Sequence, residues 1–235
     1  PASEISKINR EAADRPVEVE AGLFGLLEMA VELHGETDGA LDITASPLSD
    51  AWGFSRRQGR VPSPEELAAA LAQVGCHRVA LDAPSRSIRF TTPGVRLNLG
   101  AIGKGYALDR CAERLLDEGV NEFMIHGGQS SVLARGSTPA GADGGWSIGV
   151  HHPLRHQERL GEIRLRDAAL ATSGSEKQFF RHQGRRLSHI LDPRTGQPAE
   201  GLLSVTVVAP SAALADGLST ALFVLGAERA MEYCR

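Results

Sequence analysis

The 235-residue sequence has few cysteines, few aromatic residues, no run of like charge and no long apolar segment. Each shortage excludes a class of protein. The cysteines Cys76, Cys111 and Cys234 are odd in number and widely spaced, so they form neither a disulfide framework nor a C-x-x-C metal motif. We expect them to be small core residues. Apolar residues make up 42% of the chain, which is enough for the buried core of a globular protein.

The charge pattern predicts no nucleic-acid partner. The formal net charge is -4 and no basic run exceeds two residues, so the chain lacks the electrostatic footprint of a protein that binds nucleic acid. No stretch approaches the roughly 20 apolar residues that cross a bilayer, so no membrane span is expected. The first residues have neither the basic nor the apolar part of an export signal. Either the protein is not exported or its export segment is absent from this chain.

Hydrophobic periodicity and capping residues predict an α+β fold, and the lack of internal repeats, low-complexity tracts and long linkers favours a single domain over residues 1–235. Helical patterns cover residues 21–36, 64–74, 105–116 and 212–225. Ser63 and Ser211 are the expected N-caps of the second and fourth, and Glu66 is expected to complete a capping box with Ser63. Strand-like runs cover residues 87–92, 95–99, 121–125, 146–150, 160–165 and 203–208. Because these runs outnumber the helices and do not alternate with them, a doubly wound sheet is disfavoured.

Residues 98–106, with the sequence N-L-G-A-I-G-K-G-Y, put three glycines and a lysine just before an expected helix. Such a turn can direct backbone N–H groups and the helix dipole toward a phosphate, and Lys104 adds positive charge. The G-x-x-x-x-G-K-[ST] spacing of a Walker motif is absent. By themselves the glycines are more typical of an ordinary strand-to-helix turn.

Asp216 and Thr220 lie four residues apart in the last expected helix and therefore share one face. A carboxylate, a hydroxyl and nearby carbonyl oxygens suit a hard cation such as Mg²⁺. A structural interpretation explains an isolated pair at least as well, because Asp216 can face the helix dipole while Thr220 bonds a carbonyl. The apolar neighbours of both residues weaken the structural interpretation, since a half-buried carboxylate needs a partner or a metal.

Residues 188–198 read S-H-I-L-D-P-R-T-G-Q-P, a histidine followed by a strand-like pair and a turn. A lone histidine is more often structural than catalytic. Polar or glycine-rich segments at residues 37–44, 52–54, 127–129 and 172–174 are each explained by turn chemistry when taken alone. Their order along the chain is more informative than any one of them.

Taken in order, the segments resemble the ApbE family of FAD:protein FMN transferases. The family pattern runs S-E-I-S-x-x-N, T-x-G-x-[FL]-D-[IP]-T, W-G-F, L-G-[AS]-I-[AG]-K-G-Y-A-x-D, G-G, T-S-G, H-I-x-D-P-x-T-G-x-P and A-D-x-x-[ST]-T-A. Matches begin at Ser3 and end at Ala221, so they cover nearly the whole chain, and the most specific are at residues 99–109, 189–198 and 215–221. The resemblance implies an ApbE-type (T-fold-like) core of sheets and helices.

The resemblance also implies a transferase that splits FAD, releases AMP and attaches FMN by a phosphoester bond to a threonine of a target protein, such as a flavoprotein subunit of a redox complex. In such an enzyme Mg²⁺ would be held by the carbonyl of Ala101 and the side chains of Asp216 and Thr220. His189 would be the base for the threonine hydroxyl, and Asp192 would orient the local network. The residues implied along the flavin nucleotide are Lys104, Gly105, Gly128, Thr172, Ser173 and Gly174.

The sequence leaves two alternatives open. In a Mg²⁺-dependent FAD pyrophosphatase, water would replace the threonine as acceptor. A non-catalytic flavin-binding protein of the same fold is favoured by Asn98, where many members carry Asp, and by the expected lack of the family's N-terminal strand and helix. The resemblance implies a bacterial protein on the envelope or periplasmic side, and the sequence itself leaves the cytoplasm open.

Overall fold

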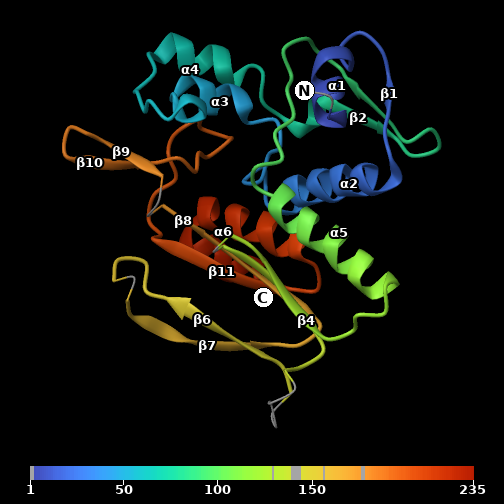
Figure 1. Cartoon of the computed structure of the whole chain (residues 1–235). Helices are drawn as coiled ribbons and strands as arrows, with labels where there is room; N and C mark the ends of the chain where they lie inside the picture. The colour runs from blue at the N-terminus through green and yellow to red at the C-terminus, as the bar shows by residue number, and fades with distance from the viewer. Residues whose placement is uncertain (1–2, 129, 139–143, 156, 176–177) are drawn as a thin grey trace. The chain divides into compact units, whose positions relative to one another are not determined.

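The computed structural model describes residues 3–128, 130–138, 144–155, 157–175 and 178–235 (Figure 1). The chain divides into two compact units. Unit 1 comprises residues 1–99 and 178–200, and unit 2 comprises residues 100–177 and 201–235. Helices and antiparallel sheets together confirm the predicted α+β class. The prediction of one domain over residues 1–235 stays a prediction, because compactness does not say which parts fold alone.

Unit 1 combines short helices with a three-stranded sheet and a separate hairpin. Its helices are α1 (Glu4–Glu11), α2 (Ala21–Glu36), α3 (Ser46–Ala51) and α4 (Pro64–Leu71), with the 3-10 turns η1 (Phe54–Arg56) and η2 (Cys76–Arg78). Its strands are β1 (Val17–Glu18), β2 (Val79–Asp82), β3 (Ser87–Phe90), β9 (Phe179–His182) and β10 (Arg185–Ser188). The sheet has the antiparallel order β1-β3-β2, and β9 pairs with β10.

The two helices predicted in unit 1 are present. The carboxylate of Glu20 caps α2 by accepting from two backbone N–H groups of its first turn. Ser63 and Glu66 form the predicted capping box at the start of α4. This helix ends at Leu71 rather than Val74, because the backbone N–H of Val74 turns back to the carbonyl of Leu71.

The prediction of a strand at residues 95–99 is wrong, because these residues form no strand in the structure. The amide side chain of Asn9 donates to the carbonyl of Leu97 (2.9 Å) and accepts from its N–H (2.7 Å), so a side chain takes the place of a neighbouring strand. The prediction of three core cysteines is also only partly right. Cys76 is buried, whereas Cys111 and Cys234 are exposed.

Unit 2 is built on a four-stranded antiparallel sheet. Its strands are β4 (Phe123–Gly127), β5 (Ser131–Arg135), β6 (Trp146–His151), β7 (Arg159–Leu165), β8 (Ala168–Gly174) and β11 (Ser204–Ala209), and its helices are α5 (Gly103–Asp117) and α6 (Ala212–Tyr233). The sheet order is β11-β8-β5-β4, and β6 pairs with β7. Helices α5 and α6 lie on one face of the sheet and the β6–β7 hairpin packs on the other (Figure 1).

Alternation along the central strands separates two cores in unit 2. Leu133, Ala169 and Ala171 pack toward the helices, whereas Ala134 and Leu170 pack toward the hairpin. Strand β8 was missed because its sequence, A-A-L-A-T-S-G, lacks the β-branched enrichment that marks strands. Residues 172–174, expected as a loop, are therefore the end of a strand.

The predicted helices of unit 2 are present with small changes in length. Helix α5 begins two residues before and ends one residue after the predicted range. Ser211 caps α6 as predicted, through a bond from the N–H of Leu214 (3.2 Å). At Gly226 the backbone leaves helical geometry with φ of 79°, and a further helical stretch runs to Tyr233. The glycine therefore marks a kink instead of the predicted end.

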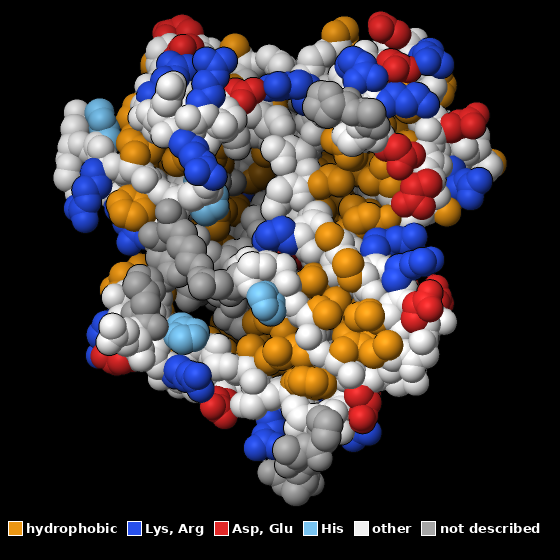
Figure 2. Space-filling view, in the orientation of Figure 1, with side chains coloured by type: hydrophobic (Ala, Val, Ile, Leu, Met, Phe, Trp, Pro, Cys, Tyr) orange, Lys and Arg blue, Asp and Glu red, His pale blue; other side chains and the backbone are white. Residues whose placement is uncertain are grey.

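Among the described residues, no helix is both long and apolar enough to cross a membrane. On the face drawn in Figure 2, acidic and basic side chains are interspersed over the surface.

Candidate functional site

Asp216 lies near the start of α6 and is only 3% exposed. The ammonium of Lys104 contacts both of its carboxylate oxygens, at 3.0 and 3.1 Å. The backbone N–H of Gly105 donates to Oδ2 at 3.1 Å, and the hydroxyl of Ser131 donates to Oδ1 at 3.3 Å. A buried carboxylate is costly unless it is paired and hydrogen-bonded, and here it is both.

The start of α5 is packed tightly against the start of α6, and this contact positions Asp216. A Cβ atom on Gly105 would lie 2.0 Å from the carbonyl oxygen of Ala212, so a side chain cannot fit there. One turn further along α5, the carboxylate of Asp109 accepts from the N–H groups of Ala212 and Ala213, both at 2.8 Å. Asp109 thus satisfies two of the open donors at the N-terminus of α6.

Hydroxyl groups surround the next turn of α6. Ser219 and Thr220 both donate to the carbonyl of Asp216, at 2.9 and 3.3 Å. The hydroxyl of Ser173, from β8, lies 2.8 Å from that of Ser219 and 3.1 Å from that of Thr220. Ser173 therefore belongs to the same polar cluster as Thr220.

The predicted flavin contacts Thr172 and Ser173 point to opposite faces of the sheet, because side chains alternate along a strand. Ser173 faces α6, whereas the hydroxyl of Thr172 lies 2.9 Å from that of Thr206 on the neighbouring strand β11. Gly174 ends β8 opposite Ser204. The structure thus brings Ser173, but not the side chain of Thr172, to the cluster at Asp216.

Two further predicted residues lie in turns of unit 2. Ala101 is half-buried in the turn before α5. Gly128 is exposed just after β4 with φ of 73°, a left-handed conformation that favours glycine, and its carbonyl lies 2.8 Å from Nδ1 of His126. Gln129, part of the same predicted segment, lies outside the described residues.

The oxygen atoms available on α6 and in the turn before α5 fit Mg²⁺. A carboxylate, a serine or threonine hydroxyl and a main-chain carbonyl are the hard oxygen ligands that this ion prefers. Asp216 carries the charge, Thr220 adds a hydroxyl on the same helix face, and Ala101 belongs to the turn leading into the helix of Lys104. The side chain of Lys104 is 45% exposed, whereas that of Asp216 is only 4% exposed.

In unit 1, His189 directly follows β10 and is half-buried. Its Nδ1 lies 3.0 Å from the carbonyl oxygen of Gln178, which also accepts the backbone N–H of His189 at 3.2 Å. A carbonyl oxygen only accepts, so this contact favours the tautomer with the proton on Nδ1. The ring of Phe54 meets the imidazole edge-on, with ring centroids 6.4 Å apart.

The turn after His189 is anchored in the core of unit 1. The indole N–H of Trp52 donates to the carbonyl of Gly196 at 2.7 Å, and a Cβ atom at Gly196, where φ is 71°, would lie 2.7 Å from Leu67. The W-G-F and T-G segments of the sequence are thus joined directly. This contact fixes the backbone of the turn.

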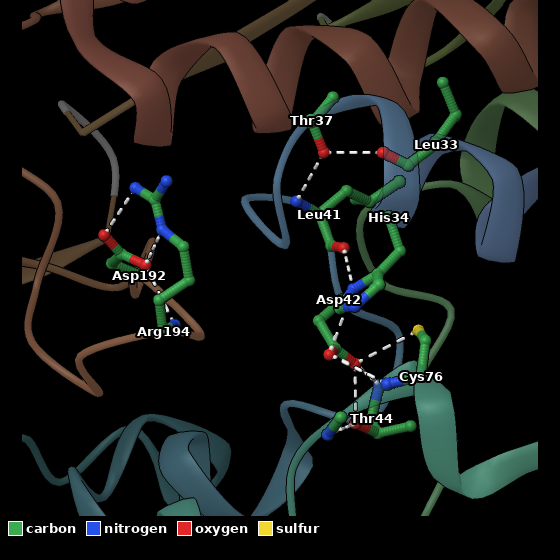
Figure 3. Close-up of polar contacts among 10 residues, drawn as sticks. Leu33, His34, Thr37, Leu41, Asp42, Thr44, Cys76, Asp192 and Arg194 are labelled. Atoms are coloured by element: carbon green, nitrogen blue, oxygen red, sulfur yellow. Dashed lines mark hydrogen bonds and ion pairs between the residues drawn. The ribbon is translucent and has the colours of Figure 1, made fainter.

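Asp192 binds Arg194 through both carboxylate oxygens, at 2.8 Å each (Figure 3). The hydrogen bonds to the Asp192 carboxylate raise the pKa of the Arg194 guanidinium above its usual value. Within the turn, the backbone carbonyl of Asp192 accepts from Gly196 at 2.7 Å. These contacts indicate that Asp192 stabilises the turn. Its catalytic role stays a prediction.

A second buried carboxylate, Asp42, lies in unit 1 among His34, Thr44 and Cys76 (Figure 3). It accepts from the N–H and hydroxyl of Thr44 at 2.7 and 2.5 Å, and from the N–H and thiol of Cys76 at 3.1 and 3.4 Å. Nδ1 of His34 lies 3.3 Å from Oδ2 and 3.0 Å from the carbonyl of Leu41.

His34, Asp42 and Cys76 present possible metal-ligand atoms within 4.8 Å of one another. The hydrogen bonds favour a structural interpretation. Burial, with the negative charge of Asp42 second, raises the pKa of the Cys76 thiol far above its usual value, so the thiol stays protonated and donates to the carboxylate. We therefore interpret this group as a network that joins the 37–44 loop to the start of η2.

Sequence reasoning did not find Ser131, Asp109 or Ser219. A serine in a strand and a serine one position before Thr220 carry no distinctive signal. Asp109 carries a weak sequence signal, because it ends the segment that matches the K-G-Y-A-x-D pattern.

Comparison with known proteins confirms the family resemblance of the sequence. The sequence model of the ApbE family matches residues 1–235. A curated protein from Haemophilus influenzae named FAD:protein FMN transferase is 36% identical over 98% of this chain and 68% of its own length. The chain thus spans about two thirds of that relative.

Solved structures resemble nearly the whole chain as well. The crystal structure of the flavinyl transferase ApbE of Pseudomonas stutzeri in its apo form has a TM-score of 0.86 and 33% identity, over 99% of this chain and 72% of that one. The ApbE protein of Thermotoga maritima has a TM-score of 0.87 and 36% identity, over 97% of this chain and 73% of that one.

Proposed function

The chain belongs to the ApbE family, and we propose that it is a Mg²⁺-dependent FAD:protein FMN transferase. In the proposed reaction FAD is split at its pyrophosphate, AMP is released, and FMN is joined to a threonine of a target protein by a phosphoester bond. The observation that carries the proposal is the buried carboxylate of Asp216, held beside a lysine and a set of hydroxyl oxygens in a chain whose relatives have this name.

Asp216, Thr220 and the carbonyl of Ala101 would hold Mg²⁺, which neutralises charge that develops on the phosphates. Lys104 would contact the same phosphates as a point charge at the start of α5. The packing of Gly105 and the cap from Asp109 support this proposal, because they hold α6 in register with α5. Ser173 adds a hydroxyl group to this cluster.

His189 would accept the proton of the acceptor hydroxyl. The threonine oxygen forms a bond to the phosphorus of the FMN half, the bond from that phosphorus to the bridging oxygen breaks, and AMP leaves with the bond's electron pair. With its proton on Nδ1, the imidazole would use Nε2 as the base. The family resemblance assigns this role, and the Gln178 contact supports the choice of nitrogen.

A direct test incubates the full chain with FAD, Mg²⁺ and a target protein that has an acceptor threonine. We expect covalent FMN on the target, detected as a mass increase, and stoichiometric AMP. A target with that threonine replaced by valine, and a reaction with a chelator in place of Mg²⁺, are the controls. AMP and free FMN without labelled target would instead establish a pyrophosphatase. Bound FAD without AMP would establish a flavin-binding protein.

A further inference from the structure

The side chain of Lys104 neutralises the buried Asp216 from a half-exposed position. The lysine contacts both oxygens of the carboxylate, yet 45% of its side chain is exposed, against 4% for Asp216. Lysine has a flexible four-carbon stem, so its ammonium can leave the carboxylate and still be solvated. The buried Asp216 has no such freedom, because an uncompensated charge in its position is costly.

Neutral groups hold Asp216 in place independently of the lysine. The N–H of Gly105 and the hydroxyl of Ser131 each bond one carboxylate oxygen. The N–H donor belongs to the backbone of α5, which is locked against α6 at Gly105. The position of the carboxylate is therefore set by the fold, while its countercharge is set by an exchangeable side chain.

A divalent cation bound by Asp216 would lie close to the ammonium of Lys104, which contacts both carboxylate oxygens. Two positive charges a few ångströms apart in a buried site repel strongly, so both cannot remain at full contact. We propose that Lys104 acts as a built-in countercharge that yields Asp216 to Mg²⁺ and then contacts the substrate's diphosphate. This inference rests on the proposed function, and it makes metal and FAD binding mutually favourable.

The exchange predicts that removal of the lysine charge strengthens metal binding in the absence of FAD. Lys104→Met keeps the length of the side chain and removes its charge. By calorimetry with Mg²⁺ alone, or with Mn²⁺ and its magnetic resonance signal, we expect affinity at least about tenfold higher than in the original chain. Without metal the variant should unfold at a lower temperature, and saturating Mg²⁺ should raise that temperature more than in the original chain.

Two further variants locate the effect. Lys104→Arg keeps the charge and should bind the metal like the original chain. Asp216→Asn should abolish binding in either background. If Asp216→Asn leaves metal binding intact, the proposed metal site is wrong. If binding depends on Asp216 but Lys104→Met does not strengthen it, the exchange is wrong while the proposed function stands.

The unaltered chain offers a measurement that does not depend on a variant folding. The sequence has three lysines, Lys7, Lys104 and Lys177, and Lys7 is exposed on α1. Saturating Mg²⁺ without FAD should raise acylation of Lys104 by an amine-reactive reagent several-fold, with Lys7 unchanged as the internal reference in peptide mass spectra. Equal labelling of Lys104 with and without bound Mg²⁺ would overturn the proposal.

Discussion

Asp42 in unit 1 and Asp216 in unit 2 are both buried carboxylates that accept from backbone N–H and hydroxyl groups, but they differ in the group that faces their charge. Asp42 accepts from backbone N–H groups, a hydroxyl and a protonated thiol, with His34 beside it. Asp216 is balanced mainly by the ammonium of a half-exposed lysine. Donors built into the backbone cannot move away, whereas a lysine can. Asp42 therefore joins a loop to η2, whereas the charge of Asp216 is matched by a side chain that reaches solvent.

The largest expected effect tests the exchangeable carboxylate. Asp216→Ala should lower Mg²⁺-dependent AMP release from FAD by about 10³-fold or more, because charge stabilisation by a bound metal is worth several kcal/mol. The N–H of Gly105 loses its acceptor, but the fold should persist, since Lys104 is exposed enough to be solvated when its partner is removed. Asp117→Ala, at the exposed end of α5, is the control and should keep full activity. Normal AMP release by the Asp216 variant would remove the basis for the contrast.

The next effect concerns chemistry assigned to unit 1. His189→Ala should slow FMN transfer by about 10²- to 10⁴-fold, the usual contribution of a general base, and leave FAD binding unchanged. Transfer is followed by the mass of the target and binding by flavin fluorescence. The exposed His182 on β9, changed to alanine, is the matched control. Equal transfer rates in the two variants would show that unit 1 does not supply the base through this residue.

Asp42 should matter for stability. Asp42→Ala leaves the N–H groups of Thr44 and Cys76 buried without their acceptor, so we expect the free energy of unfolding in urea to fall by about 3 kcal/mol. Asp14→Ala, at an exposed turn of the same unit, should change it by less than about 0.5 kcal/mol. A small effect at both positions would mean that the Asp42 network does not stabilise unit 1.

The smallest expected effect is at Asp109, the residue of α5 that accepts from the N-terminus of α6. Asp109→Ala removes the acceptor of two N–H groups and should reduce the free energy of unfolding by about 1 kcal/mol, as for other N-cap losses. Asp109→Asn keeps an acceptor oxygen and should lose less. An unfolding midpoint for Asp109→Ala equal to that of Asp117→Ala would show that the cap is not needed to hold α6.

Much of the local structure could be predicted from the sequence. Ser63 and Glu66 predicted the start of α4, and apolar periodicity predicted α2, because caps and periodic faces are short-range signals. The same reasoning failed at residues 95–99, where the chain bonds a side chain 88 residues away, and at β8, whose alanines carry little strand preference.

The sequence by itself determined the family, through ordered motifs from Ser3 to Ala221, and it determined which residue types carry charge and hydroxyl groups. Only the tertiary structure decided their partners. Lys104 and Asp216 are 112 residues apart, and no local pattern encodes their ion pair or the glycine contact that aligns their helices. The physical reason is that caps and periodicity act within a few residues, whereas the neutralisation of a buried charge depends on which helices pack together.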